Sequence, residues 1–351
     1  MKILAEFINL ANIIFAVILV AFVLMLIGFH FYTEIKALLN KRLENKIKNL
    51  LDGDEKSRSR ISKIRSLYTV RGIRVLHNLS KNLDDPQAEL LREALSTEKF
   101  SKYIRANLTF KKQAIAILTT KLIGDLKLNE FTPEVLSNLK KWEDHSETQQ
   151  IGLLALILNN RERELTELLS YEGFRLAISF RATKELMEAF PGNKKEFFKE
   201  LLSRKCDTYI YRACMHCIGN ENISELAPQV MEFLSSENLN VRISATRALG
   251  ALKYVPAKEK LQELLHHSEW ELSCAIVEAL AEISPDECYD IILPYVFHKE
   301  WWVRYRTAET LASLPFTEKL REDVEKSGDN YAKEIVFYML ERKQLGRGAN
   351  G

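Results

Sequence analysis

A 31-residue repeat near the C-terminus constrains the fold of this chain more than any other feature. Equivalent residues recur in three consecutive units, and the matching sets are Val241, Leu272 and Val303; Ala248, Ala279 and Thr310; Leu249, Leu280 and Leu311; and Leu252, Ile283 and Leu314. A fixed period of about 20–50 residues is typical of a solenoid, in which a single unit cannot bury its own apolar face. We therefore expect stacked units rather than one compact core, and a binding function rather than catalysis.

Each unit has the apolar spacing of two helices. Leu261, Leu264 and Leu265 fall at positions i, i+3 and i+4, which share one face of a helix. After a short break at 269–271, a second apolar stripe follows with helical spacing: Leu272, Ile276, Ala279, Leu280 and Ile283. The chain has only 13 Gly and 8 Pro in 351 residues, and alternating runs of β-branched residues are scarce. The composition therefore favours an all-α protein.

The repeats become less regular toward the N-terminus. The predicted organisation is clearer repeats with a C-terminal cap over 191–345, degenerate repeats over 86–190, and a disordered tail over 346–351. In the degenerate part we expect helices near 86–96, 107–126, 133–142, 146–160 and 174–190. The last unit loses the register at Gly328, as a terminal capping repeat does.

An apolar segment predicts an N-terminal membrane anchor over residues 1–35. The run from Ile13 to Phe29 has no charged or strongly polar side chain, and about 20 helical residues cross the hydrocarbon core of a bilayer. A cleaved signal peptide has an apolar stretch of about 7–15 residues and a small-x-small cleavage site. The run here is longer, and 27–32 has no such site. A buried core helix would be unusual beside a solenoid, so we predict one uncleaved transmembrane helix.

A basic segment follows the anchor and belongs to a helical linker over 36–85. Residues 36–74 contain twelve Lys or Arg and four Asp or Glu, whereas Lys2 alone precedes the apolar run. The positive-inside rule then places the repeats in the cytoplasm, behind a single pass through the cell inner (plasma) membrane. The five cysteines, an odd number within the repeat region, agree with a reducing compartment.

The basic segment has two possible roles at this point. It sets the orientation alone, or it also binds anionic lipid headgroups, where each Lys or Arg contributes about 1 kcal/mol. The lipid-binding candidates are the basic residues nearest the anchor: Lys36, Lys41, Arg42, Lys46 and Lys48. We do not expect nucleic-acid binding, because the tether restricts access and the rest of the chain is net acidic.

Two segments of the regular units resemble the second-helix signature of HEAT repeats. They read SENLNVRISATRALG at 236–250 and EWWVRYRTAETL at 300–311. The Asp typical of the family's turn is absent, and Glu237 and Glu300 are the nearest substitutes. The resemblance is good over 190–315 and weak over 60–190. It implies a scaffold that presents a concave surface built from the second helices.

Four residues are candidates for partner binding. Arg247, Glu278 and Glu309 lie one period apart and are expected to point outward from the second helices. Trp302 is the fourth, because exposed Trp residues often anchor interfaces. By contrast, Trp270 and Trp301 are equivalent by period, and we expect both to pack between repeats.

Other conspicuous residues have a structural interpretation. We expect Arg242 and Arg304, at the starts of second helices, to pair with acidic residues of the turns. Cys214 and Cys217 have a spacing that suggests a metal or redox site, but they align with small core residues of the next unit and predict core packing. His266 ends a first helix, where it suits the helix dipole.

The sequence contains none of the common catalytic motifs: no phosphate-binding glycine loop, nucleophile elbow, zinc-protease histidine pair or kinase set. We therefore predict no metal, cofactor, catalytic residue or small-molecule substrate. The preferred hypothesis is a membrane-tethered adaptor that docks a protein partner, itself membrane-associated. The alternatives are a peripheral regulator that binds anionic lipid through 36–74, and a HEAT-like enzyme of the lyase or glycosylase type.

Overall fold

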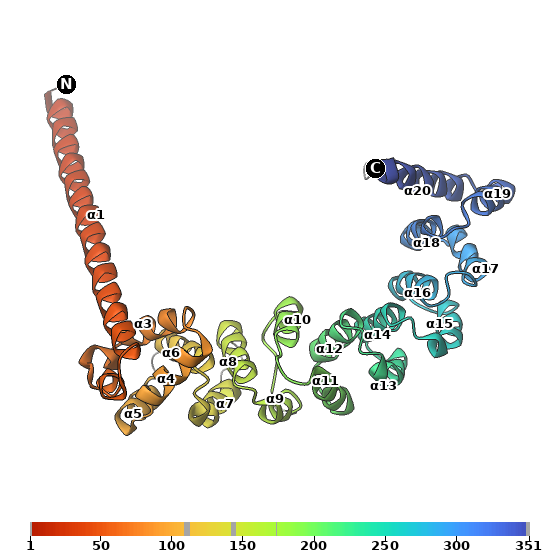
Figure 1. Cartoon of the computed structure of the whole chain (residues 1–351). Helices are drawn as coiled ribbons and strands as arrows, with labels where there is room; N and C mark the ends of the chain where they lie inside the picture. Colours follow the sequence, from red (N-terminus) through yellow and green to blue (C-terminus); the bar gives the residue numbers. More distant parts are fainter. Residues whose placement is uncertain (1, 109–112, 142–144, 173, 349–351) are drawn as a thin grey trace. The chain divides into compact units, whose positions relative to one another are not determined.

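The computed structural model describes residues 2–108, 113–141, 145–172 and 174–348, and every regular element within these ranges is a helix (Figure 1). The predicted all-α fold, with a long apolar helix at the N-terminus and helix pairs behind it, is confirmed. The chain divides into two compact units, Met1–Asn138 and Leu139–Gly351.

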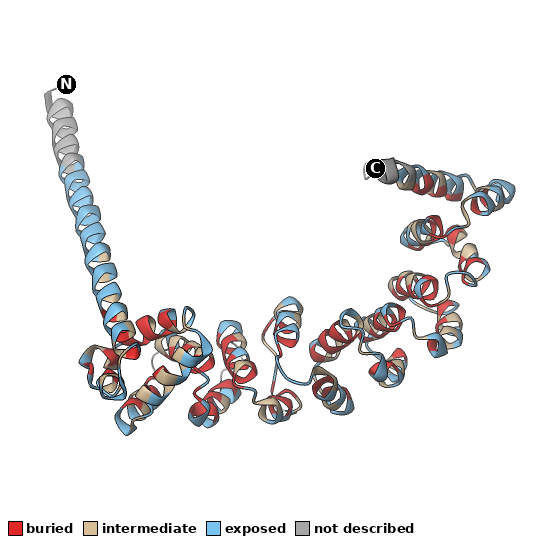
Figure 2. Cartoon of the chain, viewed as in Figure 1, coloured by how far each residue is buried: buried red, intermediate tan, exposed pale blue. Residues whose placement is uncertain are grey.

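The first unit begins with α1 (Lys2–Leu51), an uninterrupted helix of 50 residues. Most of its described side chains are exposed, and they include the large apolar residues from Phe15 to Leu39 (Figure 2). Near its C-terminal end, Leu43, Ile47 and Leu51 are buried, because their four-residue spacing forms a stripe that packs toward α3 and α4. The same helix therefore has an exposed apolar part and a C-terminal part that packs into a folded core.

Short helices complete the first unit. They are α2 (Glu55–Arg58), α3 (Val70–Ser80), α4 (Asp85–Leu95), α5 (Glu98–Asn107), α6 (Gln113–Asp125) and α7 (Thr132–Lys141), the last of which contains the boundary between the units. Helices α3 and α6 pack together, and His77 Nδ1 lies 2.5 Å from Asp125 Oδ2. A Cβ on Gly72 would lie 2.4 Å from the Leu67 carbonyl oxygen, so the entry to α3 requires glycine.

The second unit is an array of helix pairs. Its helices are α8 (Ser146–Leu158), α9 (Glu162–Leu169), α10 (Phe180–Glu188), α11 (Lys194–Ser203), α12 (Thr208–Asn220), α13 (Ala227–Glu232), α14 (Leu239–Ala251), α15 (Lys258–Leu265), α16 (Trp270–Ile283), α17 (Tyr289–Ile292), α18 (Trp301–Ser313), α19 (Thr317–Ser327) and α20 (Asn330–Gly348). The second helices of the pairs, α10, α12, α14, α16, α18 and α20, each contact the next in this order (Figure 1). The repeat residues Val241, Leu272 and Val303 are all buried at these contacts.

The period is also visible in the backbone at the ends of helices. Asn222 and Lys253 follow α12 and α14, and both have a positive φ, of 55° and 51°. Beside them, the amides of Ile223 and Tyr254 donate to the carbonyls of Ile218 and Leu249, each at 3.0 Å. This is the Schellman arrangement, which satisfies carbonyls left free at a helix end. The same arrangement follows α6 at Lys127 and α8 at Asn160.

Small residues allow the second helices to approach closely. A Cβ on Gly250 of α14 would lie 2.9 Å from Ala279 Cα of α16. A Cβ on Gly219 of α12, one period earlier, would lie 3.3 Å from Ala248 Cα of α14. The repeat therefore places glycine where the backbones of neighbouring second helices meet.

Several predicted helix boundaries differ from the structure. The helix expected over 174–190 begins at Phe180, because the buried Gln149 side chain pairs with the backbone of Arg175 and Ala177 and holds that segment extended. The break expected over 269–271 lies earlier, since α16 begins at Trp270. Helix α20 continues to Gly348, into the predicted tail, and 349–351 lie outside the described residues.

Candidate partner-binding surface

The second helices present a row of equivalent polar residues. His216, Arg247, Glu278 and Glu309 lie one period apart on α12, α14, α16 and α18. Arg247 is exposed, and the other three are partly exposed. Arg247, Glu278 and Glu309 are three of the four residues that the sequence predicted to bind a partner. The row therefore offers polar groups to a partner along the second-helix face.

The acidic end of this row is already paired within the chain. The Arg306 guanidinium lies 3.6 Å from Glu278 and 2.8 Å from Glu309, and Arg342 lies 3.9 Å from the other oxygen of Glu309. All four side chains are partly exposed, so each pair contributes at most about 1 kcal/mol to stability. Glu278 and Glu309 are therefore largely neutralised as binding groups.

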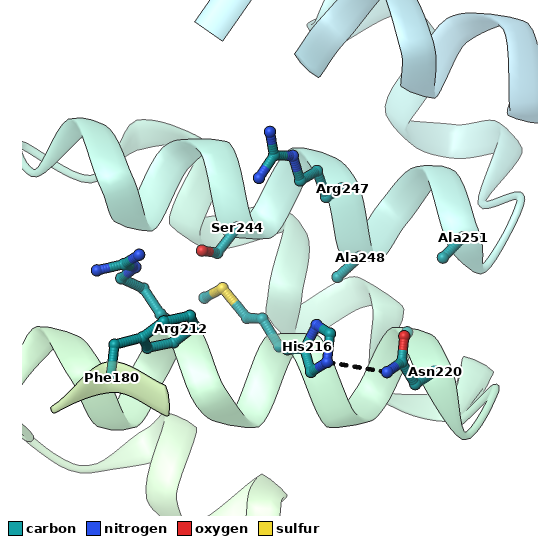
Figure 3. Close-up of a pocket in the computed structure, with 10 residues that line it drawn as sticks. Phe180, Arg212, His216, Asn220, Ser244, Arg247, Ala248 and Ala251 are labelled. Atoms are coloured by element: carbon teal, nitrogen blue, oxygen red, sulfur yellow. Dashed lines mark hydrogen bonds between the residues drawn. The ribbon is translucent and has the colours of Figure 1, made fainter. Parts of the chain in front are cut away.

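Arg247 differs, because no Asp or Glu of the described residues lies within ion-pair distance of it. It lines a pocket of about 150 Å³ between α10, α12 and α14, together with Arg212, which has no such ion pair either (Figure 3). The other lining residues are Phe180, Met215, His216, Gly219, Asn220, Ser244, Ala248 and Ala251. The structure thus brings two unpaired guanidinium groups to one pocket.

Arg212 is held against aromatic rings. Its guanidinium carbon lies 4.1 Å from the centroid of the Phe180 ring and 5.6 Å from that of Tyr209, distances at which cation–π attraction operates. Its Nε atom is buried and has no hydrogen-bond partner. Burial lowers the pKa of Arg212, and the nearby charge of Arg247 lowers it further, although a guanidinium stays protonated at neutral pH. The pocket therefore contains a fixed and incompletely satisfied cation.

His216 supplies a polar but uncharged wall at neutral pH. Burial lowers its pKa below the usual 6.5, and the Lys184 charge acts in the same direction. Its Nε2 lies 2.9 Å from the Asn220 amide nitrogen (Figure 3). The same ring nitrogen lies 3.5 Å from a carboxylate oxygen of Glu188. The positive charge of the pocket therefore resides on Arg212 and Arg247.

The comparison with known families falls on this part of the chain. Residues 196–273, which include α12 and α14, match the family model of HEAT repeats. This part of the chain consists of HEAT repeats. Proteins of this family commonly mediate protein–protein interaction as scaffolds and are typically not catalytic. No curated protein matches the chain.

The HEAT repeats carry a cluster of exposed aromatic residues at the start of α18. Trp301 and Trp302 are 52% and 53% exposed, and their rings lie 4.7 Å apart. The expectation that Trp270 and Trp301 pack between repeats is wrong, because both are exposed. Trp301 stacks instead on Tyr305, one turn later in the same helix, with ring centroids 5.0 Å apart. Trp302 is accessible, and its contact with a partner remains a prediction.

Two neighbouring cysteines of α12 belong to the core. Cys214 and Cys217 are fully buried, and burial raises the pKa of the Cys217 thiol to about 12. Such thiols are poor nucleophiles and poor metal ligands. In the described ranges, no group of three or more His, Cys, Asp or Glu side chains could hold a metal ion.

The basic residues beside the apolar part of α1 differ in their partners. Lys48 pairs with Glu44 at 2.9 Å. Lys36 lies 5.8 Å from the centroid of the Tyr32 ring. The remaining candidates, Lys41, Arg42 and Lys46, are exposed, and no ion pair involves them among the described residues. They are therefore available to an external anion.

Sequence reasoning found Arg247 but missed Arg212 and Phe180. Arg212 is replaced by Ile243 one period later, and Phe180 precedes the regular units, so the repeat gave no signal for either. The sequence signal for Arg212 was a charged residue on the second-helix face without an acid three or four positions away.

Proposed function

We propose that this HEAT-repeat protein is a membrane-anchored adaptor, in which α1 spans the bilayer and the second-helix face binds a protein partner. The proposed membrane anchor rests on the hydropathy and exposure of α1. The stretch Val17–Leu51 has a mean hydropathy of 2.0 in its most apolar part, and none of that part is buried. It is long and apolar enough to cross a membrane.

The energetic argument for the bilayer comes from the exposed side chains of α1. Phe15, Leu24, Met25 and Phe29 are each at least 60% exposed, and many similar residues accompany them. Burying one such side chain is worth about 1.5–3 kcal/mol. A hydrocarbon environment would supply this stabilisation along the whole exposed apolar part of α1. The buried residues Leu43, Ile47 and Leu51 of the same helix favour an anchor that stays attached to the folded chain over a cleaved leader.

The orientation follows from charge. Lys36, Lys41, Arg42 and Lys46 lie just beyond the apolar stretch, and Lys2 lies before it. This asymmetry favours an inner-membrane protein with its repeats in the cytoplasm. The five free cysteines are compatible with that compartment.

The adaptor function rests on the family and on the second-helix face. HEAT repeats commonly bind proteins, and this face offers unpaired Arg247 and exposed Trp302. A tether raises the local concentration of the repeats at the membrane, which strengthens binding to a partner that is membrane-associated as well.

Fractionation of cells tests the anchor. The full chain should stay with membranes after carbonate or high-salt washing, and a chain lacking residues 2–33 should be soluble. A second variant tests the same point without removing any residue: replacing Leu19, Val23 and Leu26 by Lys should also release the chain from membranes. Release of the wild-type chain by salt would contradict a spanning helix.

A second candidate function, binding of anionic lipid, is favoured by the unpaired Lys41, Arg42 and Lys46. The chain lacking residues 2–33 should then sediment with vesicles that contain phosphatidylglycerol, and less with neutral vesicles. Binding should weaken with salt, because the attraction is screened. Equal sedimentation of a variant with these three residues changed to Gln would exclude this function.

A further inference from the structure

We propose that the pocket between α10, α12 and α14 binds an acidic peptide segment of a protein partner, with one carboxylate entering beside Arg212 and neighbouring acids meeting Arg247. This inference deepens the proposed adaptor function and rests on it, because it names the chemistry of the partner at the second-helix face. The pocket is formed within the second compact unit.

Arg212 and Arg247 lack ion pairs within the described ranges, whereas several arginines at the helix starts and on the second helices have them. Arg242 lies 2.7 Å from Glu269, Arg304 lies 3.4 Å from Asp329, and Arg306 contacts two acids. Arg212 and Arg247 have no corresponding acid among the described residues. They are also close enough for Arg247 to disfavour the charge on Arg212. An anion from outside would relieve this repulsion and supply the missing partners.

Arg212 is held in place before any ligand binds. The Phe180 ring at 4.1 Å limits the rotation of its guanidinium. The Nε atom is buried and has no protein partner, so part of the desolvation cost of binding is present in the free protein. A planar guanidinium with free donors suits the two oxygens of a carboxylate.

The size and lining of the pocket suit a single side chain. Small-molecule sites usually measure about 300–1,000 Å³, whereas this pocket measures about 150 Å³. That volume accommodates one side chain better than a whole metabolite. Met215, Ala248 and Ala251 give the pocket apolar surface, which suits the methylene groups of a Glu side chain. The pocket therefore fits an acidic side chain presented by a peptide.

The test uses the full chain in lipid nanodiscs and fluorescein-labelled peptides followed by fluorescence anisotropy. One peptide carries a run of Glu, a second carries Gln at the same positions, and a third carries phosphoserine there. We expect saturable, salt-sensitive binding of the Glu peptide and none of the Gln peptide. Arg212→Gln and Arg247→Gln should each weaken binding by about tenfold or more, as expected for losing a charge-assisted hydrogen bond.

Arg181→Gln is the matched control, because Arg181 is an exposed arginine of α10 that pairs with Glu185 at 2.9 Å. It should bind the Glu peptide like the wild type. Arg247→Gln should keep the wild-type unfolding midpoint, since Arg247 makes no ion pair in the part of the chain that the structure describes. Arg212→Gln should keep a cooperative unfolding transition, with a small decrease in the midpoint from the lost cation–π contacts with Phe180 and Tyr209. Absence of saturable binding by the Glu peptide, binding unaffected by both substitutions, or binding of the phosphoserine peptide in place of the Glu peptide would overturn the proposal.

The adaptor function and the acid-binding pocket can be disproved separately. If cross-linking in cells finds a partner on the second-helix face but the Gln variants retain it, the adaptor function stands and the acidic pocket is wrong. If the Glu peptide binds as expected but no partner is found in cells, the pocket is an acid-binding site and the adaptor function is wrong.

Discussion

Arg242 of one repeat reaches Glu269 in the turn between the two helices of the next, with 2.7 Å between the guanidinium and the carboxylate. The same guanidinium donates to the carbonyls of Ser236 and Glu237 in its own turn. Arg304 repeats this connection with the His298 carbonyl and Asp329. In both cases the acid belongs to the following turn, and not to Glu237 or Glu300 of the same turn. The arginines therefore tie consecutive units together.

Loss of the Arg242 connection should destabilise the array. We expect Arg242→Ala to lower the free energy of unfolding by about 1–2 kcal/mol, because its half-buried guanidinium makes charge-assisted hydrogen bonds. Arg247→Ala is the control and should change stability by less than about 0.5 kcal/mol. Urea unfolding of the chain lacking residues 2–33, followed by circular dichroism, measures both. If both substitutions lower the free energy of unfolding equally, the contact between Arg242 and Glu269 does not stabilise the array.

The close approach of α14 and α16 predicts a graded response to added methyl groups. Gly250→Ala should destabilise by about 1–3 kcal/mol, because the new Cβ meets the backbone at Ala279 and overpacks the contact. Gly219→Ala should cost less, since its nearest contact is longer and alanine favours a helix. Thermal unfolding of the two variants compares them. A Gly250→Ala variant as stable as the wild type would contradict the packing described.

Acid should weaken the C-terminal end of the array. The amide of Ala332 donates to Asp329 and lowers the pKa of that carboxyl below 3.8, and Arg304 contributes in the same direction. A depressed pKa in the folded state stabilises the fold above pH about 4 and ceases to do so as pH falls through the folded value. Asp329→Asn keeps a capping acceptor but removes the charge.

This substitution should therefore reduce the difference in unfolding midpoint between pH 7 and pH 3, measured by urea titration. The variant should also be less stable than the wild type at pH 7, where the wild-type carboxylate is charged. An unchanged pH dependence would mean that Asp329 does not respond to acid in this way.

The burial of the Cys214 and Cys217 thiols predicts selective alkylation. Cys214 and Cys217 should resist iodoacetamide at pH 8 in the folded chain, while Cys206 and Cys274, which are partly exposed, should react slowly. All should react after unfolding in urea. Peptide mass spectrometry reads each site. Rapid labelling of Cys214 in the folded chain would contradict its place in the core.

Much of the fold could be predicted from the period, because the positions it relates are those that pack. Val241, Leu272 and Val303 are buried in succession, and Cys214 and Cys217 fall at small core positions. The 31-residue period did not predict helix boundaries that depend on local interactions. Gln149 delays the start of α10.

The binding surface was less predictable than the fold. Arg247, Glu278 and Glu309 look equivalent in sequence, but Arg306 pairs with the two acids and leaves the arginine free. The partner of a side chain on a neighbouring helix depends on rotamer and distance, which a single sequence does not contain. Phe180 reaches Arg212 across 32 positions of chain, and no repeat relates them.

Site-specific photocross-linking in intact cells tests the central claim, a membrane-anchored adaptor that binds through its second helices, most directly. A photoreactive amino acid replaces Ser244, at the pocket, or Gln262, on the first helix α15, in the full chain. We predict a discrete adduct in the membrane fraction from position 244, with one protein that carries an acidic segment, and none from position 262. Arg212→Gln together with Arg247→Gln should abolish it. No adduct at position 244, or an adduct that persists in the double variant, would contradict the account.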